Sequence, residues 1–159
     1  MIAKYMGYEY AYISNRRSKE IVTSQKVKID GSFNSEKGFY YKKVSEDDLT
    51  DIYNIEFCVT YKSGLKDVPI TWILENEAKV IVDNKIQLVF AEGILPGWDI
   101  VEKNVCSKWV ELSDVSEAKI VTVYKKKNGI VCEPRVREER NISNTDLVLL
   151  HSKYCRKNI

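Results

Sequence analysis

The chain has few of the residues and motifs that mark common catalytic and metal sites. It contains one histidine, His151, and four scattered cysteines without a C-x-x-C pair, at Cys58, Cys106, Cys132 and Cys155. A zinc site needs clustered ligands that close a tetrahedron, so no metal site is expected. The phosphate-loop patterns G-x-x-x-x-G-K-S/T and G-x-G-x-x-G are absent. A Ser-His-Asp or Cys-His scheme would need His151, and no G-x-S-x-G motif accompanies it, so no catalytic triad is expected.

Glycine and proline are also scarce, with 7 and 3 among 159 residues, and the apolar runs are short. No Pro/Gly-rich linker divides the chain, so residues 1–159 are predicted to form a single globular domain. No segment has the length of a signal-peptide core or of a membrane span. A cytoplasmic protein with reduced thiols, no structural disulfide and no membrane partner is therefore expected.

The net charge of +2 is too small to indicate nucleic acid by itself. Residues 106–159 carry 11 Lys/Arg against 7 Asp/Glu, and the excess lies mainly in YKKK at 124–127 and RVREER at 135–140. Acidic residues interleave with these basic runs. A solvated hairpin edge is therefore favoured over a phosphate-facing patch, and nucleic acid is not the expected partner.

Runs of β-branched and aromatic residues, mostly bounded by turn residues, dominate the chain and predict strands. They lie at 8–14, 38–44, 53–61, 68–74, 78–83, 85–92, 106–112, 119–126 and 130–136. Asn128-Gly129 suits the positive φ angles of a type I′ turn and predicts a hairpin. A second hairpin is expected to reverse at Asp83-Asn84. Pro134 lacks a backbone donor, so its strand is predicted to lie at an edge or to end there.

Helices are predicted to be few and short. Three segments begin with a capping residue, namely Ser14 or Asn15 (running to about Gln25), Ser45 with Asp48, and Ser143 with Asp146. The last segment, residues 146–155, could equally be a buried strand. The fold class is therefore predicted as β-dominated α+β, with mostly antiparallel sheet and two or three short helices.

Aromatic residues gather near the start of the chain. Tyr8, Tyr10 and Tyr12 share one face of a strand by two-residue alternation. Such a stripe is either half-buried core or a stacking platform for a base or a nicotinamide ring, and core packing is favoured. The loop EGILPGWD, at 92–99, either carries binding residues or is a turn with Trp98 packed on the core.

The opening stretch combines YAYIS at 10–14, a short predicted helix and KGFYY at 37–41. Over residues 8–44 it resembles the N-terminal half of small ADP-ribosyltransferase-like domains. The resemblance implies that Tyr12 and Ser14 lie near the nicotinamide ribose of NAD, and that Tyr40 and Tyr41 stack on the nicotinamide ring.

The same resemblance implies an acidic catalytic residue on a later strand, with Glu111 and Glu133 as the two candidates. The family also uses an Arg or His in the first strand, where this sequence has Ala11. The expected function is therefore binding of NAD or a related nucleotide, without efficient transfer. The alternative is a non-catalytic protein-binding module, an inhibitor or immunity-type protein that acts through an edge strand or an aromatic patch. A nucleic-acid binder that uses the basic C-terminal third ranks third.

Overall fold

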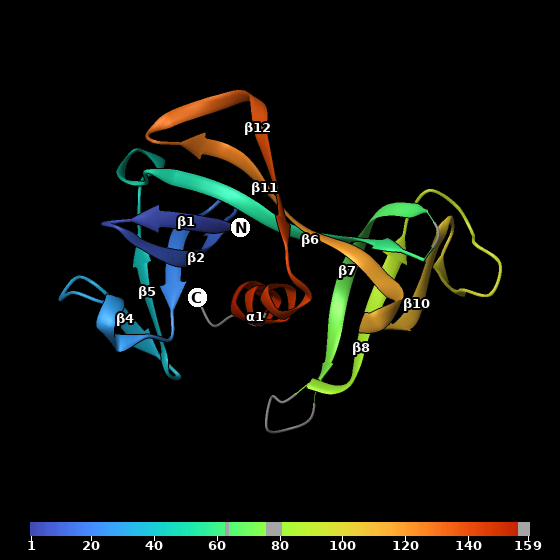
Figure 1. Ribbon diagram of the computed structural model, residues 1–159. Helices are drawn as coiled ribbons and strands as arrows, with labels where there is room; N and C mark the ends of the chain where they lie inside the picture. Colours follow the sequence, from blue (N-terminus) through green and yellow to red (C-terminus); the bar gives the residue numbers. More distant parts are fainter. Residues whose placement is uncertain (63, 76–80, 156–159) are drawn as a thin grey trace. The chain divides into compact units, whose positions relative to one another are not determined.

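The computed structural model describes residues 1–62, 64–75 and 81–155 (Figure 1). The described residues are mostly antiparallel β-strands, with one α-helix among them. The chain divides into two compact units, and each is discontinuous in sequence. The first comprises Met1–Ile55, Thr122–Glu138 and Leu150–Ile159, and the second comprises Glu56–Val121 and Glu139–Leu149. A single domain over 1–159 stays a prediction.

The first unit is built on antiparallel strands. They are β1 (Ile2–Tyr5), β2 (Tyr8–Ser14), β3 (Lys19–Thr23), β4 (Asn34–Glu36), β5 (Phe39–Lys43) and the start of β6 (Asp51–Tyr61). These strands pair in the order β4-β5-β3-β2-β1-β6. β6 also pairs with β11 (Val115–Lys127), which pairs with β12 (Ile130–Ile142), so β12 lies beyond β11 on the side away from β6 in Figure 1.

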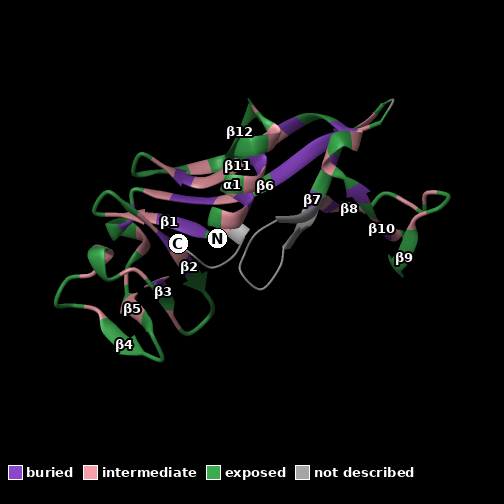
Figure 2. Cartoon of the chain, turned by 60° about the horizontal axis from the view of Figure 1, so that its bottom comes forward, coloured by how far each residue is buried: buried purple, intermediate pink, exposed green. Residues whose placement is uncertain are grey.

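One face of this sheet carries the core of the first unit. Ala3 lies opposite Tyr10, and Tyr12 opposite Ile21, and directly opposed residues project to the same face. The buried cluster consists of Ala3, Tyr10, Tyr12, Ile21, Leu49 and Ile52. Core packing of Tyr10 and Tyr12 is thus confirmed, whereas Tyr8 is exposed. Figure 2 shows buried residues along β1 and β6 and exposed residues over β4.

The second unit has its own pairing order, β6-β7-β8-β10-β9. Its further strands are β7 (Leu65–Glu75), β8 (Ile81–Phe90), β9 (Asp99–Glu102) and β10 (Val105–Glu111). Its core includes Phe57, Val59, Val68, Ile86, Leu88, Cys106 and Val110. Trp98 packs edge-on against Tyr61 with ring centroids 6.0 Å apart, which favours the interpretation of 92–99 as a turn.

The helix predicted from Ser14 or Asn15 to Gln25 is wrong, because β3 occupies its middle. Along β3, Ile21 and Thr23 are fully buried while their neighbours are not, a two-residue period. Pairing of this β-branched run with β2 and β5 outweighs the local helix signal.

The other two cap signatures are confirmed, but only one starts a full helix. Ser45 forms a capping box with Asp48, yet the 3-10 helix ends there and the chain enters β6. Ser143 Oγ accepts the Asp146 N–H at 3.0 Å and begins helix α1 (Asn144–Cys155), so residues 146–155 are helix. The β-dominated, antiparallel fold class is confirmed, but the expected two or three short helices are not: the described residues form one α-helix, α1, and single 3-10 turns at Lys26–Lys28, Glu46–Asp48 and Leu112–Asp114.

The hairpin at Asn128-Gly129 is confirmed, with φ angles of 50° and 81°, and joins β11 to β12. Pro134 lies in β12, which pairs only with β11 among the described strands, so its edge position is also confirmed. The reversal predicted at Asp83-Asn84 is wrong, because both residues lie within β8. Residues 78–80 of the run predicted at 78–83 lie outside the described residues.

Helix α1 is tied to β2 through the Glu9 carboxylate. Lys153 Nζ lies 2.7 Å from Glu9 Oε2, and the Tyr53 hydroxyl donates to Oε1 at 2.6 Å. The Tyr154 hydroxyl lies 3.3 Å from Oε1. Burial raises the pKa of Glu9, but hydrogen bonds from Lys153 and Tyr53 outweigh it and hold that pKa below its ordinary value. The Glu9 carboxylate therefore stays ionised, and its contacts with Lys153 and Tyr154 hold the last turn of α1 against β2.

Cys58, Cys106 and Cys132 form no disulfide among the described residues, and the side chain of Cys155 is outside the description. No group of His, Cys, Asp and Glu side chains in this part of the chain could hold a metal ion. None of the helices described is long and apolar enough to cross a membrane.

Candidate functional site

The loop between β2 and β3 presents two arginines in a fixed turn. Asn15 Oδ1 accepts the backbone N–H groups of Arg17 and Ser18, both at 2.8 Å. The Asn15 N–H donates to the Ser18 carbonyl at 3.0 Å. An asparagine side chain that satisfies the backbone in this way stabilises a tight reversal. The turn therefore holds Arg16 and Arg17 at its tip without needing glycine.

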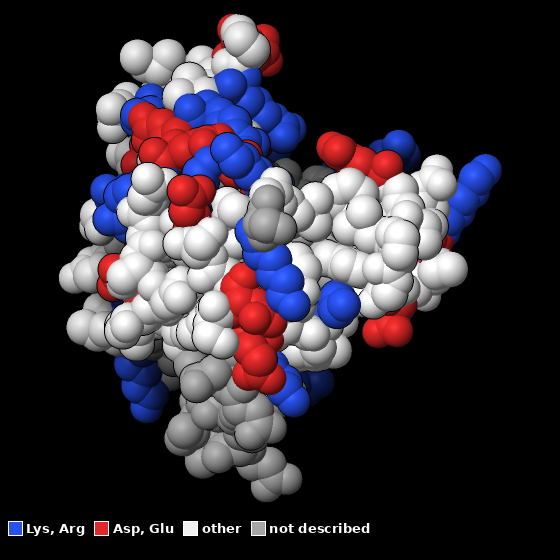
Figure 3. All heavy atoms as spheres, turned by 45° about the vertical axis from the view of Figure 1, so that its right-hand side comes forward, with Lys and Arg blue, Asp and Glu red and all other residues white. Residues whose placement is uncertain are grey.

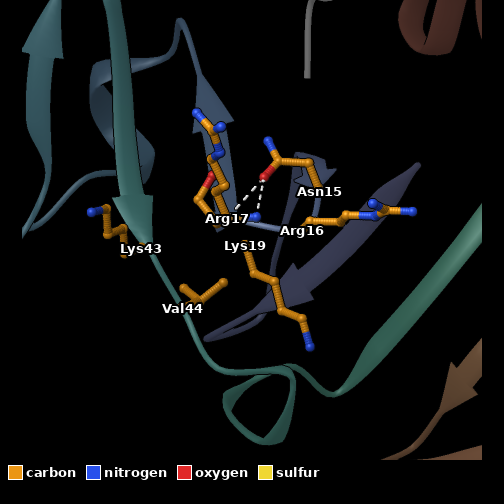
Figure 4. Close-up of a pocket in the computed structure, with 7 residues that line it drawn as sticks. Asn15, Arg16, Arg17, Lys19, Lys43 and Val44 are labelled. Carbon is orange, nitrogen blue, oxygen red and sulfur yellow. Dashed lines mark hydrogen bonds between the residues drawn. The ribbon is translucent and has the colours of Figure 1, made fainter.

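This loop and the end of β5 enclose a basic hollow of about 350 Å³. Figure 4 shows its charged side chains spreading around the rim from β2–β3 and β5. It is lined by Asn15, Arg16, Arg17, Ser18, Lys19, Lys43 and Val44, with no acid among them. Arg16, Arg17 and Lys43 form no ion pair in the described part of the chain. Adjacent uncompensated cations repel one another, so the hollow favours an anion.

Next to the basic hollow, the Glu46 carboxylate forms ion pairs with two lysines. Glu46 Oε1 lies 2.8 Å from Lys125 Nζ and 3.3 Å from Lys19 Nζ, and it accepts the Tyr12 hydroxyl at 3.1 Å. The Lys126 ammonium, almost fully buried, donates to the Glu46 carbonyl at 2.7 Å. The hydrogen bond from Lys125, with those from Tyr12 and Lys19, lowers the pKa of Glu46 to about 2. This network fixes Lys19 at the edge of the hollow.

A second hollow of about 490 Å³ opens on the outer face of β3, β4 and β5. It is lined by Glu20, Val22, Glu36, Lys37, Phe39 and Tyr41. Phe39 is 44% exposed and Tyr41 is half-buried, so both rings are accessible from solvent. An exposed aromatic surface of this kind can stack on a planar ligand.

One side chain of the basic hollow, Lys43, projects to the face of the sheet that carries the aromatic hollow. Lys43 and Tyr41 alternate with Lys42 along β5, so their side chains project to one side, about 7 Å apart along the strand. Glu20 lies opposite Lys43, and Val22 opposite Tyr41, on the neighbouring strand. The aromatic hollow, the Glu20 carboxylate and the Lys43 ammonium thus lie on this face, whereas Lys19 of the basic hollow turns to the core side and reaches Glu46. We call the residues of both hollows the outer face.

The residues expected to hold the nicotinamide do not all meet. Tyr40 lies opposite Thr23 and shares the inner, core face with Tyr12, while Tyr41 lies on the outer face. Neighbouring residues of one strand point to opposite faces, so Tyr40 and Tyr41 cannot stack on one ring. Tyr12 is buried with its hydroxyl on Glu46, and Ser14 is exposed at the end of β2, beside Asn15 of the basic hollow.

Neither acid proposed for catalysis lines a hollow of the outer face. Glu133 is exposed in β12 of the first unit. Glu111 ends β10 in the second unit, where Lys85 lies 4.0 Å from its carboxylate. Sequence reasoning missed Arg16, Arg17, Lys43 and Glu20. Their signal was an Asn-Arg-Arg-Ser turn between two strands, which was interpreted as the start of a helix.

The fold is β-rich, and two open hollows lie on the first unit. Residues 1–130 match the family described as "Uncharacterised conserved protein UCP033725", and the protein belongs to that family. The match includes every residue of the outer face. No curated protein and no solved structure matches the chain.

Proposed function

We propose that this protein binds a nucleotide non-covalently on the outer face. The phosphates occupy the basic hollow, and the base or nicotinamide ring stacks on Phe39 and Tyr41. The observation that carries the proposal is that Lys43 of the basic hollow projects from β5 to the same face as Phe39 and Tyr41 of the aromatic hollow. NAD and ADP-ribose are the ligands of first choice, because of the resemblance of residues 8–44 to ADP-ribosyltransferase-like domains.

The physical requirements of a nucleotide support this choice. Its phosphates need several cationic donors, and arginine offers a planar fork that matches two phosphate oxygens. The two hollows have volumes of about 350 and 490 Å³, within the range of about 300–1,000 Å³ for small-molecule sites. The preformed Asn15 turn reduces the ordering cost of binding.

We expect binding without efficient transfer of ADP-ribose. The resembled family uses an Arg or His at the position of Ala11, and alanine offers no group to a phosphate or ribose. Incubation with NAD should therefore release nicotinamide no faster than buffer does. A cytoplasmic location, where thiols stay reduced and NAD is present, is part of this proposal.

Titration calorimetry with ADP-ribose tests the proposal. Replacing Arg17 with Ala should weaken binding about tenfold, since one charge-assisted contact is worth about 1.5–3 kcal/mol. Arg135→Ala is the matched control, because Arg135 is exposed on β12 and lines neither hollow. Tyr41→Ala should weaken ADP-ribose binding but leave inorganic diphosphate binding unchanged. No binding of NAD or ADP-ribose by the native protein would refute the proposal.

The second candidate function is protein binding through β12. This 13-residue strand is paired on one side among the described strands, and Ile130 and Val131 are 71% and 61% exposed. Acids and bases interleave at the height of β11 and β12 in Figure 3, which suits a protein partner better than a phosphate backbone. A free edge accepts an added strand.

A photo-crosslinker at Val136 should capture a protein that then binds in calorimetry, and Val131→Pro should abolish that binding.

A further inference from the structure

Glu20 lines the aromatic hollow and pairs across the strands with a residue of the basic hollow. It lies directly opposite Lys43 of the basic hollow, so their Cβ atoms are about 5 Å apart. It also lines the aromatic hollow together with Phe39 and Tyr41. Its side chain is half-buried, and its carboxylate has no hydrogen bond or ion pair within the described residues.

We propose that the Glu20 carboxylate accepts the ribose hydroxyls of the bound nucleotide, so that the site selects ribonucleotides over sugars that lack these hydroxyls. This inference rests on the proposed function. In a nucleotide the ribose lies between phosphate and base, and Glu20 lines the aromatic hollow opposite Lys43 of the basic hollow. A carboxylate is an acceptor-only group that can receive two hydroxyl donors at once.

An unpartnered carboxylate also explains why a sugar, and not a further phosphate, belongs at this position. A phosphate beside Glu20 would meet a like charge in a half-buried setting, which is unfavourable. Two neutral hydroxyl donors would satisfy the carboxylate without adding charge. A site built to hydrogen-bond a hydroxyl rejects an analogue without it, because its polar group is then left unpaired.

Calorimetry with ADP and 2′,3′-dideoxy-ADP tests the inference. The native protein should bind ADP at least about tenfold more tightly than the dideoxy compound. Glu20→Ala should remove that preference. It should also strengthen the binding of inorganic diphosphate, because a repelling charge is gone. A variant that loses its preference for ADP over the dideoxy compound but binds diphosphate more tightly is still folded, because loss of folding would weaken the binding of every ligand.

Glu36→Ala is the matched control, since Glu36 lines the same aromatic hollow but lies beyond Phe39 on β4. It should keep the preference for ADP. Equal binding of ADP and dideoxy-ADP by the native protein would overturn the role of Glu20 while leaving nucleotide binding intact. Loss of the preference in Glu36→Ala but not in Glu20→Ala would also overturn it. Failure of the native protein to bind ADP would overturn both proposals.

Discussion

At the residue scale, the Glu46 carboxylate of the first unit lies between several cations. It bridges Lys125 and Lys19 and receives the Tyr12 hydroxyl, and its pKa falls from 4.5 to about 2. The unfolded chain takes up this proton near pH 4.5, whereas the folded protein takes it up near pH 2. Ionised Glu46 therefore contributes stability that is complete above about pH 5 and is lost as pH falls toward 2.

We expect Glu46→Gln to lose less stability than the native protein on acidification. Free energies of unfolding in urea at about pH 6 and pH 3 measure this, and the difference between proteins isolates the Glu46 contribution. Glu36→Gln should follow the native protein, because Glu36 is largely exposed. Equal losses in Glu46→Gln and native protein would show that Glu46 contributes nothing over this range.

The sequence identified the local partners of single residues but not the distant ones. Ser45 with Asp48 and Ser143 with Asp146 were recognised, because both partners lie within three positions of one another. Glu46 and Lys125 lie 79 positions apart, and nothing in their local sequence specifies the contact. The basic hollow was missed for a similar reason, since Arg17 and Lys43 meet only through pairing of β3 with β5.

At the element scale, the β2–β3 turn illustrates how a local signal misleads. Asn15 is a good helix cap, and it does accept backbone N–H groups, but those groups belong to a strand reversal. The β-branched run Ile21-Val22-Thr23 decides the outcome, because its alternate residues become buried in the sheet. The strand content was predictable from composition, whereas the partner of each strand was not.

The β11–β12 hairpin provides a test at the same scale. Gly129 has a φ of 81°, where an alanine Cβ is strained, so Gly129→Ala should cost about 1 kcal/mol in the free energy of unfolding. Gly31→Ala is the matched control, since Gly31 lies outside the left-handed region and an added Cβ meets nothing within 4 Å. Urea unfolding measures both. A cost at Gly129 no larger than at Gly31 would contradict the type I′ assignment.

At the scale of the whole molecule, the two compact units share four elements. β6, β11, β12 and α1 each contribute residues to both units. If such a strand loses its pairing in one unit, the part of the same strand that belongs to the other unit is loosened as well. We therefore expect both units to unfold in one transition, as small domains commonly do.

All three tryptophans, Trp72, Trp98 and Trp109, belong to the second unit, so their fluorescence reports on that unit alone. Ile52→Ala removes a fully buried side chain from the core of the first unit and should cost about 3 kcal/mol. The fluorescence midpoint in urea should fall together with the midpoint from circular dichroism. Val27→Ala, at a position 77% exposed, should leave both unchanged. A fluorescence midpoint unaffected by Ile52→Ala would mean that the units unfold independently.

The hairpin turn also bears on the chemical ageing of the protein. In an Asn-Gly pair the glycine backbone nitrogen can attack the asparagine side-chain carbonyl and displace ammonia, and water then opens the resulting succinimide ring to aspartate or isoaspartate. Here the Gly129 N–H is held by the Thr50 carbonyl at 2.7 Å, and the Asn128 N–H by Asp51 Oδ1 at 2.7 Å. The attacking nitrogen is thus engaged and its backbone is fixed. Asn128 should deamidate slowly in the folded protein and rapidly once the hairpin opens, so that isoaspartate at this position records how long a preparation has spent unfolded.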